Sequence, residues 1–299
     1  MKKLPLVFSG CLLGLAGAGN LVLDTLPVLS HLFSLTGLIL WMYFLILHLF
    51  NWKETKQELA KPPLLSGMAT FPMAGMILST YVFRVFSYLP LVAQGLWWFS
   101  FLLDLALIAG FTIKFACPGQ RVHATPSWTV LYVGIAVAAL TYPLVGIIEI
   151  AYATLSFGFL LTFYLYPLIY SDLKKHPLPL ALLGQEGIYC APFSLLLASL
   201  VRVGGASLPT WVLTVMLLAS QSFFFFVLTR LPNILKQGFQ PAFSALTFPT
   251  IIIATSLKMA QGILKLPFLD YLVLAETVIC LIILLFVLGA YLIWLRKKV

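Results

Sequence analysis

The sequence predicts an all-α integral membrane protein that forms a single transmembrane domain over residues 1–299. First, 62% of the residues are hydrophobic and only 9% are Asp, Glu, Lys or Arg, whereas about 25% of a soluble protein is charged. Second, the apolar runs are unbroken for about 20 residues, the length of an α-helix that crosses about 30 Å of hydrocarbon. The strands of a membrane barrel alternate apolar and polar residues instead. Third, the longest polar run, residues 51–63, is too short for a separate water-soluble domain.

Ten apolar runs predict ten transmembrane helices. In order along the chain they cover about residues 4–23, 28–50, 64–83, 90–113, 127–147, 149–170, 180–201, 209–229, 241–262 and 268–294. We number these runs one to ten and distinguish the odd runs from the even runs. Runs five and six are separated so briefly that they are expected to form a tight hairpin.

The basic residues indicate the orientation of the chain, because loops rich in Lys and Arg stay in the cytoplasm. With ten helices both termini lie on one side of the membrane. Of the 18 Lys and Arg residues, only four fall on the opposite side: Arg84, Arg202, Lys258 and Lys265. We therefore expect a multi-pass membrane protein with both termini in the cytoplasm. The net charge of +9 then comes from loops that orient the chain and attract anionic lipid, and no nucleic-acid partner is expected.

Sequence motifs of enzymes, ATP-driven pumps and metal sites are missing. The four cysteines and four histidines show no metal-ligand spacing. The sequence also lacks a phosphate-binding loop, a dinucleotide-binding fingerprint and a G-x-S-x-G nucleophile motif. We therefore expect neither an enzyme nor a primary pump, and no metal or other cofactor.

Prolines distinguish the odd runs from the even runs. Runs three, five, seven and nine each contain an interior proline: Pro72, Pro143, Pro192 and Pro249. An interior proline kinks a helix and frees a carbonyl, which the membrane tolerates only where protein or a water-filled cavity satisfies it. The odd runs are therefore predicted to form an inner layer, and each odd run is predicted to form a hairpin with the next even run. The alternative is that proline and glycine are simply common in membrane helices.

Acidic residues inside the apolar runs are further candidates, because carboxylates in a membrane are usually functional. They are Asp104, Glu186 and Glu276. Glu186 is the strongest candidate because it lies in an odd run, but it is only about two turns from the cytoplasmic end and can reach water. We expect it to be structural, with a coupling role as the alternative, and we expect Asp104 to make a contact between helices. A pore without acidic rings favours anions.

Five segments resemble the tellurite-resistance/dicarboxylate transporter family, which includes bacterial TehA-type proteins, fungal malate and sulfite transporters, and plant slow anion channels. They are residues 10–20, 72–76 (PMAGM), 126–128 (PSW), 191–194 (APFS) and 244–250 (SALTFPT). The resemblance implies five helical hairpins around a central pore lined by the odd helices, in a homotrimer. It also implies that the phenylalanine of the ninth helix plugs the pore, and the matching residue here is Phe248.

The function expected from this resemblance is an anion channel or uniporter-like transporter in the plasma membrane, with an aromatic gate and a largely uncharged pore. Its partners are small inorganic or carboxylate anions and the lipid bilayer. Members of the family move chloride, nitrate, sulfite or malate, or confer tellurite resistance, and nothing in the sequence selects among these substrates. The alternative function is a proton-coupled or sodium-coupled carrier of C4-dicarboxylates, or a tellurite or sulfite carrier, that uses a titratable residue such as Glu186.

Two groups of residues carry specific expectations about this pore. Pro249 directly follows Phe248, so a bend there can turn the ring towards the axis; the alternative is that Phe248 is ordinary core packing. The four outer basic residues all follow odd runs and are expected to form an electropositive outer mouth that concentrates anions. Their alternative role is to complement helix C-termini and to extend to the membrane surface.

Overall fold

The computed structural model describes residues 4–117 and 121–297, and this part of the chain contains helices and no strands. The predicted all-α membrane class is therefore confirmed. Among the described residues, nine helical segments are long and apolar enough to cross a membrane, and a shorter apolar segment, Leu6–Leu21, precedes them. We call these ten segments spans one to ten in chain order.

The odd spans are each divided into shorter helices. Their elements are Leu6–Phe8 (η1) and Ser9–Leu21 (α1); Pro62–Gly67 (α4) and Thr70–Val85 (α5); Ser127–Val133 (α7), Gly134–Ala136 (η3), Val137–Thr141 (α8) and Tyr142–Leu144 (η4); Leu180–Cys190 (η5), Ala191–Gly204 (α10) and Gly205–Ser207 (η6); and Pro241–Leu246 (η7) with Thr247–Leu264 (α12). In the odd spans the label η marks 3₁₀-helices, whereas η2 of an even span is a π-helix. A change of helix type interrupts hydrogen bonding in four of these spans, and span three is interrupted between α4 and α5, so each odd span carries at least one break.

The even spans are long and mostly continuous. Their helices are Pro27–Phe50 (α2), Pro90–Phe111 (α6), Ile148–Lys175 (α9), Thr210–Lys236 (α11) and Pro267–Lys297 (α13), with a π-helical end at Thr112–Ala116 (η2) and a separate short helix at Trp52–Glu58 (α3). Three of these helices begin with a proline, which fits the first helical position because its missing N–H has no partner there anyway.

Burial separates the odd spans from the even spans. Spans three, five, seven and nine bury 78%, 72%, 61% and 78% of their apolar windows, whereas the even spans bury 22–39%. Every residue of α1 except Asn20 is buried. Because protein rather than lipid surrounds α1, its 16-residue span need not match the full hydrocarbon thickness. The odd spans thus lie inside and the even spans expose apolar side chains around them.

The predicted kink prolines lie at the starts of helices. Pro72, Pro192 and Pro249 are the third, second and third residues of α5, α10 and α12. The first turn of a helix has no internal partner for these N–H groups, so each proline follows a break instead of bending a continuous helix. Pro143 is different, because it lies in the 3₁₀ turn η4 at the end of its span. Span five is interrupted earlier, at Gly134–Ala136, so an interior kink at Pro143 is corrected to a helix-ending turn.

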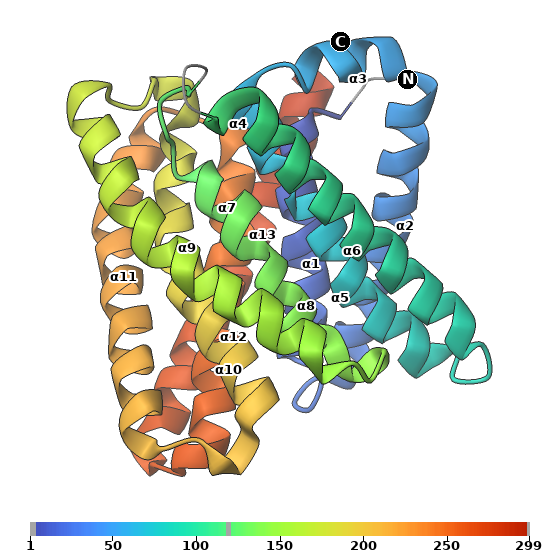
Figure 1. Ribbon diagram of the computed structural model, residues 1–299, viewed down its shortest axis with the longest axis vertical. Helices are drawn as coiled ribbons and strands as arrows, with labels where there is room; N and C mark the ends of the chain where they lie inside the picture. The colour runs from blue at the N-terminus through green and yellow to red at the C-terminus, as the bar shows by residue number, and fades with distance from the viewer. Residues whose placement is uncertain (1–3, 118–120, 298–299) are drawn as a thin grey trace.

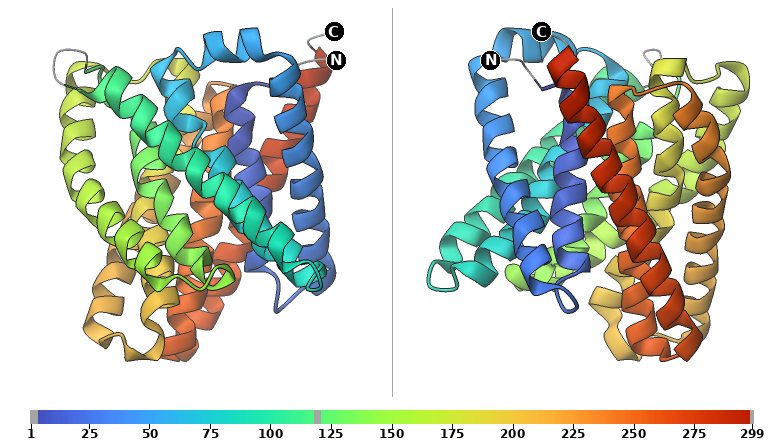
Figure 2. Two further views of the ribbon diagram at one scale, coloured as in Figure 1. Left: turned by 45° about the vertical axis from the view of Figure 1, so that its right-hand side comes forward. Right: turned by 180° about the vertical axis from the view of Figure 1, so that it is seen from behind.

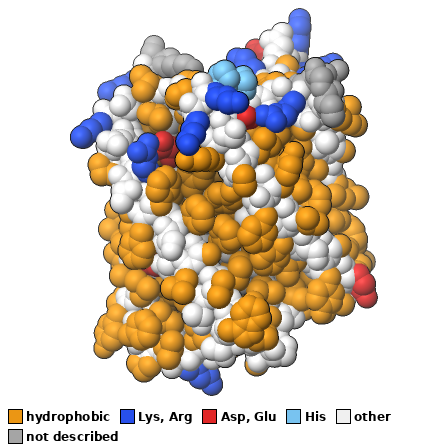
Figure 3. Space-filling view, turned by 60° about the vertical axis from the view of Figure 1, so that its left-hand side comes forward, with side chains coloured by type: hydrophobic (Ala, Val, Ile, Leu, Met, Phe, Trp, Pro, Cys, Tyr) orange, Lys and Arg blue, Asp and Glu red, His pale blue; other side chains and the backbone are white. Residues whose placement is uncertain are grey.

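The first and last helices of the described chain, η1 and α13, begin and end at the same end of the molecule, respectively (Figures 1 and 2). We call this end the terminal end and the opposite one the far end. Figure 3 shows hydrophobic side chains covering most of one face, with Lys, Arg and His side chains gathered towards the terminal end. This distribution matches an apolar belt for lipid with a basic rim at one boundary.

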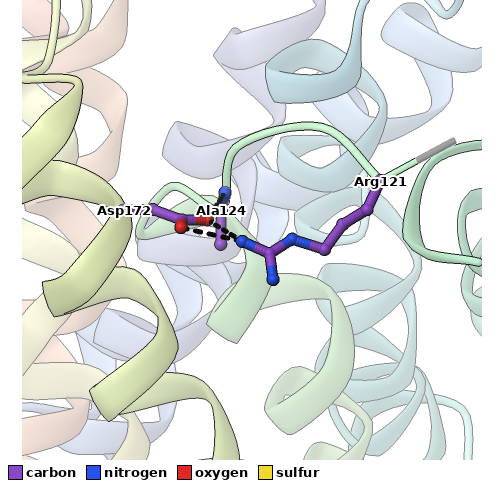
Figure 4. A network of polar contacts seen from close by, with 3 residues as sticks. All are labelled: Arg121, Ala124 and Asp172. Atoms are coloured by element: carbon purple, nitrogen blue, oxygen red, sulfur yellow. Dashed lines mark hydrogen bonds and ion pairs between the residues drawn. The ribbon is translucent and has the colours of Figure 1, made fainter. Parts of the chain in front are cut away.

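A polar network at the terminal end fixes the entry into α7 (Figure 4). The guanidinium of Arg121 donates to both carboxylate oxygens of Asp172 at 2.7 Å, and the backbone N–H of Ala124 donates to the same carboxylate at 2.8 Å. Next to it, the rings of His123 and His176 stack with centroids 3.6 Å apart. The connection between the fourth and fifth spans is thereby tied to the end of α9.

Candidate functional site

A cavity of about 60 Å³ lies towards the terminal end and is lined only by odd spans. Every odd span contributes to its wall: Val7, Gly10 and Leu13; Pro63, Gly67, Thr70 and Met73; Ser127, Thr129, Val130, Val133 and Gly134; Gln185, Ile188, Ala191, Pro192 and Leu195; Ala242, Ser244, Ala245, Phe248 and Pro249. We call it the terminal-side cavity. Its wall contains no Asp, Glu, Lys, Arg or His.

A larger cavity of about 730 Å³ lies towards the far end and is lined by all five odd spans and by Leu23 and Asp24 of the connection that follows span one. Its wall consists of Asn20, Leu21, Leu23 and Asp24; Thr80, Phe83 and Arg84; Leu140, Thr141, Pro143 and Leu144; Arg202; and Thr255, Lys258, Met259 and Gly262. We call it the far-side cavity. Three of the four predicted outer basic residues lie in this wall, and the fourth, Lys265, ends α12 in a left-handed conformation outside it.

The two cavities are separated by a layer of nearly constant thickness. In each odd span, the last residue of the terminal-side cavity and the first residue of the far-side cavity are six or seven positions apart: 13 and 20, 73 and 80, 134 and 140, 195 and 202, 249 and 255. At 1.5 Å per helical residue this is about 10 Å. We call the intervening residues, 14–19, 74–79, 135–139, 196–201 and 250–254, the barrier layer. Its residues carry no ionisable side chain.

Phe248 lies where the terminal-side cavity meets the barrier layer, and its side chain is 4% exposed. The ring packs against Gly17 of α1: a Cβ built on Gly17 would lie 3.2 Å from Cδ2 of Phe248. Gly10 and Gly14 approach Ser244 and Thr247 just as closely. The glycines of α1 therefore allow α12 to lie against its backbone and leave no free space behind the ring.

Side chains on three sides hold the first turn of α12 in place. The hydroxyl of Thr247 donates to the carbonyl of Gly10 at 2.8 Å. On other sides of the helix, the thiol of Cys280 donates to the carbonyl of Thr250 at 2.7 Å and that of Cys190 to the carbonyl of Pro249 at 3.5 Å. Phe248 is thus mounted on a turn that is fixed by contacts from α1, η5 and α13.

The basic residues of the far-side cavity differ in how their charge is compensated. The ammonium of Lys258 lies 3.0 Å from the carboxylate of Asp24 and donates to the carbonyl of Leu21 at 2.9 Å. The guanidinium of Arg84 lies 5.6 Å from the centroid of the Tyr81 ring. Neither Arg84 nor Arg202 forms an ion pair with a described carboxylate. Sequence reasoning missed Asp24, because it counted only basic residues at this end.

The acidic candidates lie outside both cavity walls. Glu186 accepts two hydrogen bonds from Arg230, at 2.9 and 3.0 Å, which join η5 to α11. Asp104 is fully buried in α6, and neither of its carboxyl oxygens has a hydrogen-bond partner among the described residues. Glu276 is buried in α13 close to Gln221 of α11. The described part of the chain brings no three His, Cys, Asp or Glu side chains together as a metal site.

Comparison with known families and proteins gives one match. Residues 3–292 match the family described as "Voltage-dependent anion channel" (SLAC1). No curated protein matches the chain.

Proposed function

The chain belongs to the voltage-dependent anion channel (SLAC1) family, and on this premise we propose that it conducts small anions passively through the two cavities, with Phe248 as the gate between them. The observation that carries the proposal is that all five odd spans line each cavity, that no even span does, and that the cavities end about 10 Å apart at the level of this ring. Anion transport itself follows from membership of the family.

The charges along this path favour a channel for anions over a coupled carrier. The far-side cavity offers two arginines that form no ion pair with a described carboxylate, although Asp24 of the same wall attracts Arg84 from a greater distance. The terminal-side cavity and the barrier layer contain no acidic side chain. A carrier needs a titratable group that faces the substrate. Glu186 does not meet this requirement, because it pairs with Arg230 outside both cavity walls. This distribution supports passive movement down an electrochemical gradient.

A phenylalanine at this position can close the path in two ways. The ring fills the narrow space next to Gly17, and its apolar surface excludes the water that a permeating anion needs. Because the ring is mounted on a fixed turn, we propose that it opens by a rotamer change rather than by movement of α12. Staggered rotamers are separate wells, so the gate would have discrete positions.

Orientation and assembly are part of the same proposal. We propose that the terminal end faces the cytoplasm, in keeping with the excess of basic residues there, and that the far-side cavity opens outside the plasma membrane. We also propose a homotrimer in which each chain keeps its own path, because both cavities are lined within one chain.

The test is potential-driven flux of chloride and nitrate into liposomes that contain the purified protein, without a proton or sodium gradient. Flux under these conditions supports the channel, and strict dependence on a proton or sodium gradient would support the carrier instead. Phe248→Ala should increase the flux per folded molecule, since it removes the obstruction. Phe225→Ala is the matched control, because Phe225 is 57% exposed on α11 and away from the path. Unchanged or lower flux from well-folded Phe248→Ala protein would identify the ring as core packing.

A further inference from the structure

The two arginines of the far-side cavity carry charge that its wall does not compensate. The wall contains three basic side chains and one acidic side chain, a net charge of +2: Arg84, Arg202, Lys258 and Asp24. The carboxylate of Asp24 lies 3.0 Å from the ammonium of Lys258 and attracts Arg84 only from a greater distance. Arg84 and Arg202 are exposed residues of the wall, so a ligand in the cavity can reach both.

These two arginines stand on spans that are not neighbours. The contacts between helices arrange the odd spans in a closed ring, in which α1 packs on α5, α5 on α8, α8 on α10, α10 on α12, and α12 on α1. Arg84 belongs to α5 and Arg202 to α10, so another span separates them in either direction around the ring. Packed helices have axes about 8–10 Å apart, which places non-neighbouring axes of such a ring about 15 Å apart. A monovalent anion at one guanidinium therefore leaves the other without a counter-ion.

The hydrogen bonds within the wall leave few other donors for an anion. The hydroxyls of Thr80, Thr141 and Thr255 each donate to a carbonyl three or four positions earlier in the chain. A hydroxyl that has donated its proton can only accept, and an anion needs donors. The donors that remain are the two guanidinium groups, the side-chain amide of Asn20, and the ammonium of Lys258, which already donates twice within the wall. The guanidinium groups are therefore the main anion-binding groups of this cavity.

The cavity can hold an organic ion that the barrier layer does not pass. A water molecule takes up about 30 Å³ of the liquid, so about 730 Å³ has room for an ion of several carbon atoms together with its hydration. The barrier layer beyond it has no ionisable side chain. Because the Born cost of leaving water grows with the square of the charge, a doubly charged ion needs about four times the energy of a singly charged one to cross.

We propose that the far-side cavity binds a small linear organic dianion between Arg84 and Arg202, with one anionic group at each arginine, and that this ion blocks the path from the far side. A guanidinium binds the oxygens of such a group through two parallel N–H donors. Once one end is bound, the other end is confined near the second arginine, which raises its effective concentration there. The proposal rests on the anion-conducting function proposed above and adds a class of blocking ligand to it.

The test compares butanedisulfonate, which has a sulfonate at each end, with butanesulfonate, which has the same carbon chain and a single charge. Chloride current is measured in planar bilayers at constant ionic strength, with the sulfonate on both sides so that the orientation of the protein does not matter. Butanedisulfonate should block the wild type at a lower concentration than butanesulfonate. Arg84→Gln and Arg202→Gln should each raise the concentration of butanedisulfonate that halves the current about tenfold.

Lys265→Gln is the matched control for these variants. It removes the same charge at the same end of the molecule, but Lys265 lies outside the cavity wall, so block by butanedisulfonate should be unchanged. Arg202→Lys keeps the charge and removes the two-pronged donor, so it should weaken the block less than Arg202→Gln does. Each variant is compared with its own unblocked current, which removes differences in the amount of folded protein.

Thermal unfolding of the detergent-solubilised protein provides a readout that does not depend on transport. A ligand that binds only the folded state raises the unfolding temperature, so butanedisulfonate should stabilise the wild type more than butanesulfonate does at the same ionic strength. Each protein is compared with itself without ligand, so a change in its intrinsic stability cancels. The difference between the two sulfonates should disappear in Arg84→Gln and in Arg202→Gln.

The outcomes separate this inference from the function on which it rests. Equal block and equal stabilisation by the two sulfonates, or the same loss of block in Lys265→Gln as in the arginine variants, overturn the dianion site and leave the anion channel standing. Current carried by butanedisulfonate as the sole anion overturns the block. A wild type that butanedisulfonate stabilises but that conducts no chloride overturns the channel and supports the site. Block and stabilisation that require both arginines support the whole proposal.

Discussion

Gly17→Ala tests the gate by acting on the closed position of the ring without removing the ring. A Cβ at residue 17 would lie 3.1 Å from Cγ2 of Ile251, 3.2 Å from Cδ2 of Phe248 and 3.4 Å from its Cε2. Carbon atoms attract each other best at about 3.5–4.0 Å, so the ring has to retreat by a few tenths of an ångström. The overlap with Ile251 is present in every position of the ring, whereas the overlap with Phe248 destabilises only the closed rotamer and shifts the gate towards the rotamers in which the ring has left Gly17.

The expected size of the effect follows from the cost of overpacking. Extra methylenes in a packed core cost about 1–3 kcal/mol, and one methyl group with an overlap of a few tenths of an ångström belongs at the lower end, about 1 kcal/mol. Since 1.36 kcal/mol corresponds to a factor of ten, the ratio of open to closed gates should rise about fivefold. Flux per folded molecule should rise by the same factor as long as the gate is mostly closed.

The assay is chloride flux into proteoliposomes, normalised to folded protein. Gly289→Ala is the matched control, because a Cβ there meets nothing within 4 Å, yet it adds the same helix propensity in α13. The decisive experiment is a double-mutant cycle: in a Phe248→Ala background, Gly17→Ala should have no further effect, because the ring that it pushes is gone. Equal increases with and without the ring would refute the reasoning, as would an unchanged flux in the single variant.

Three further predictions address the charged residues. Neutralising Arg84 and Arg202 to Gln should lower inward anion flux at 0.01 M salt, where the Debye length is about 30 Å, and should have less effect at 0.15 M, where it is about 8 Å. Lys258→Gln should have a smaller effect on the flux, because Asp24 already compensates the charge of Lys258. A loss of flux that is equal at both salt concentrations would contradict the electropositive mouth. Glu186→Gln should leave the flux and its pH optimum unchanged. It should lower the free energy of unfolding by at most about 1 kcal/mol, because its partner Arg230 is half exposed. Loss of the flux in this variant would support the coupled carrier instead of the channel. Asp172→Asn should lower the free energy of unfolding by about 2 kcal/mol, because it removes the charge that accepts three hydrogen bonds. An unchanged melting temperature would show that this network does not stabilise the fold.

The layered arrangement could be predicted from the sequence because its signals are local. Prolines and glycines in alternate apolar runs indicate which helices lie inside, and the composition of each run alone is enough for this assignment. The positions of the breaks could not be predicted in this way. The eleven residues of η5 form a 3₁₀-helix in which Gly184 and Gly187 lie against η7. Because this contact joins residues about sixty positions apart, the local sequence does not indicate where the break falls. The same limit explains Pro143, whose place in a closing turn depends on where span five ends.

The site residues that sequence reasoning missed are those whose roles depend on distant partners. Lys258 and Asp24 are 234 positions apart in the chain, so the compensation of the lysine charge is invisible in the sequence. Sequence reasoning selected Glu186, because it is a charged residue in an apolar run, and did not select its neighbour Gln185. A polar but uncharged residue in an odd run was the available signal, and only the structure shows that Gln185 and not Glu186 forms part of the cavity wall.

The uncharged barrier layer also determines where a transmembrane voltage acts. A potential of 100 mV is worth about 2.3 kcal/mol for one elementary charge. In the proposed channel ions reach both cavities through water, so this energy falls across about 10 Å instead of the about 30 Å of a bilayer, and the local electric field is about three times stronger. Because the walls of the layer carry no ionisable side chain, the field acts on the anion in transit and not on the helices. The current–voltage relation should therefore be a continuous curve, as expected for ions that cross one steep energy barrier, and should show no threshold voltage at which current begins.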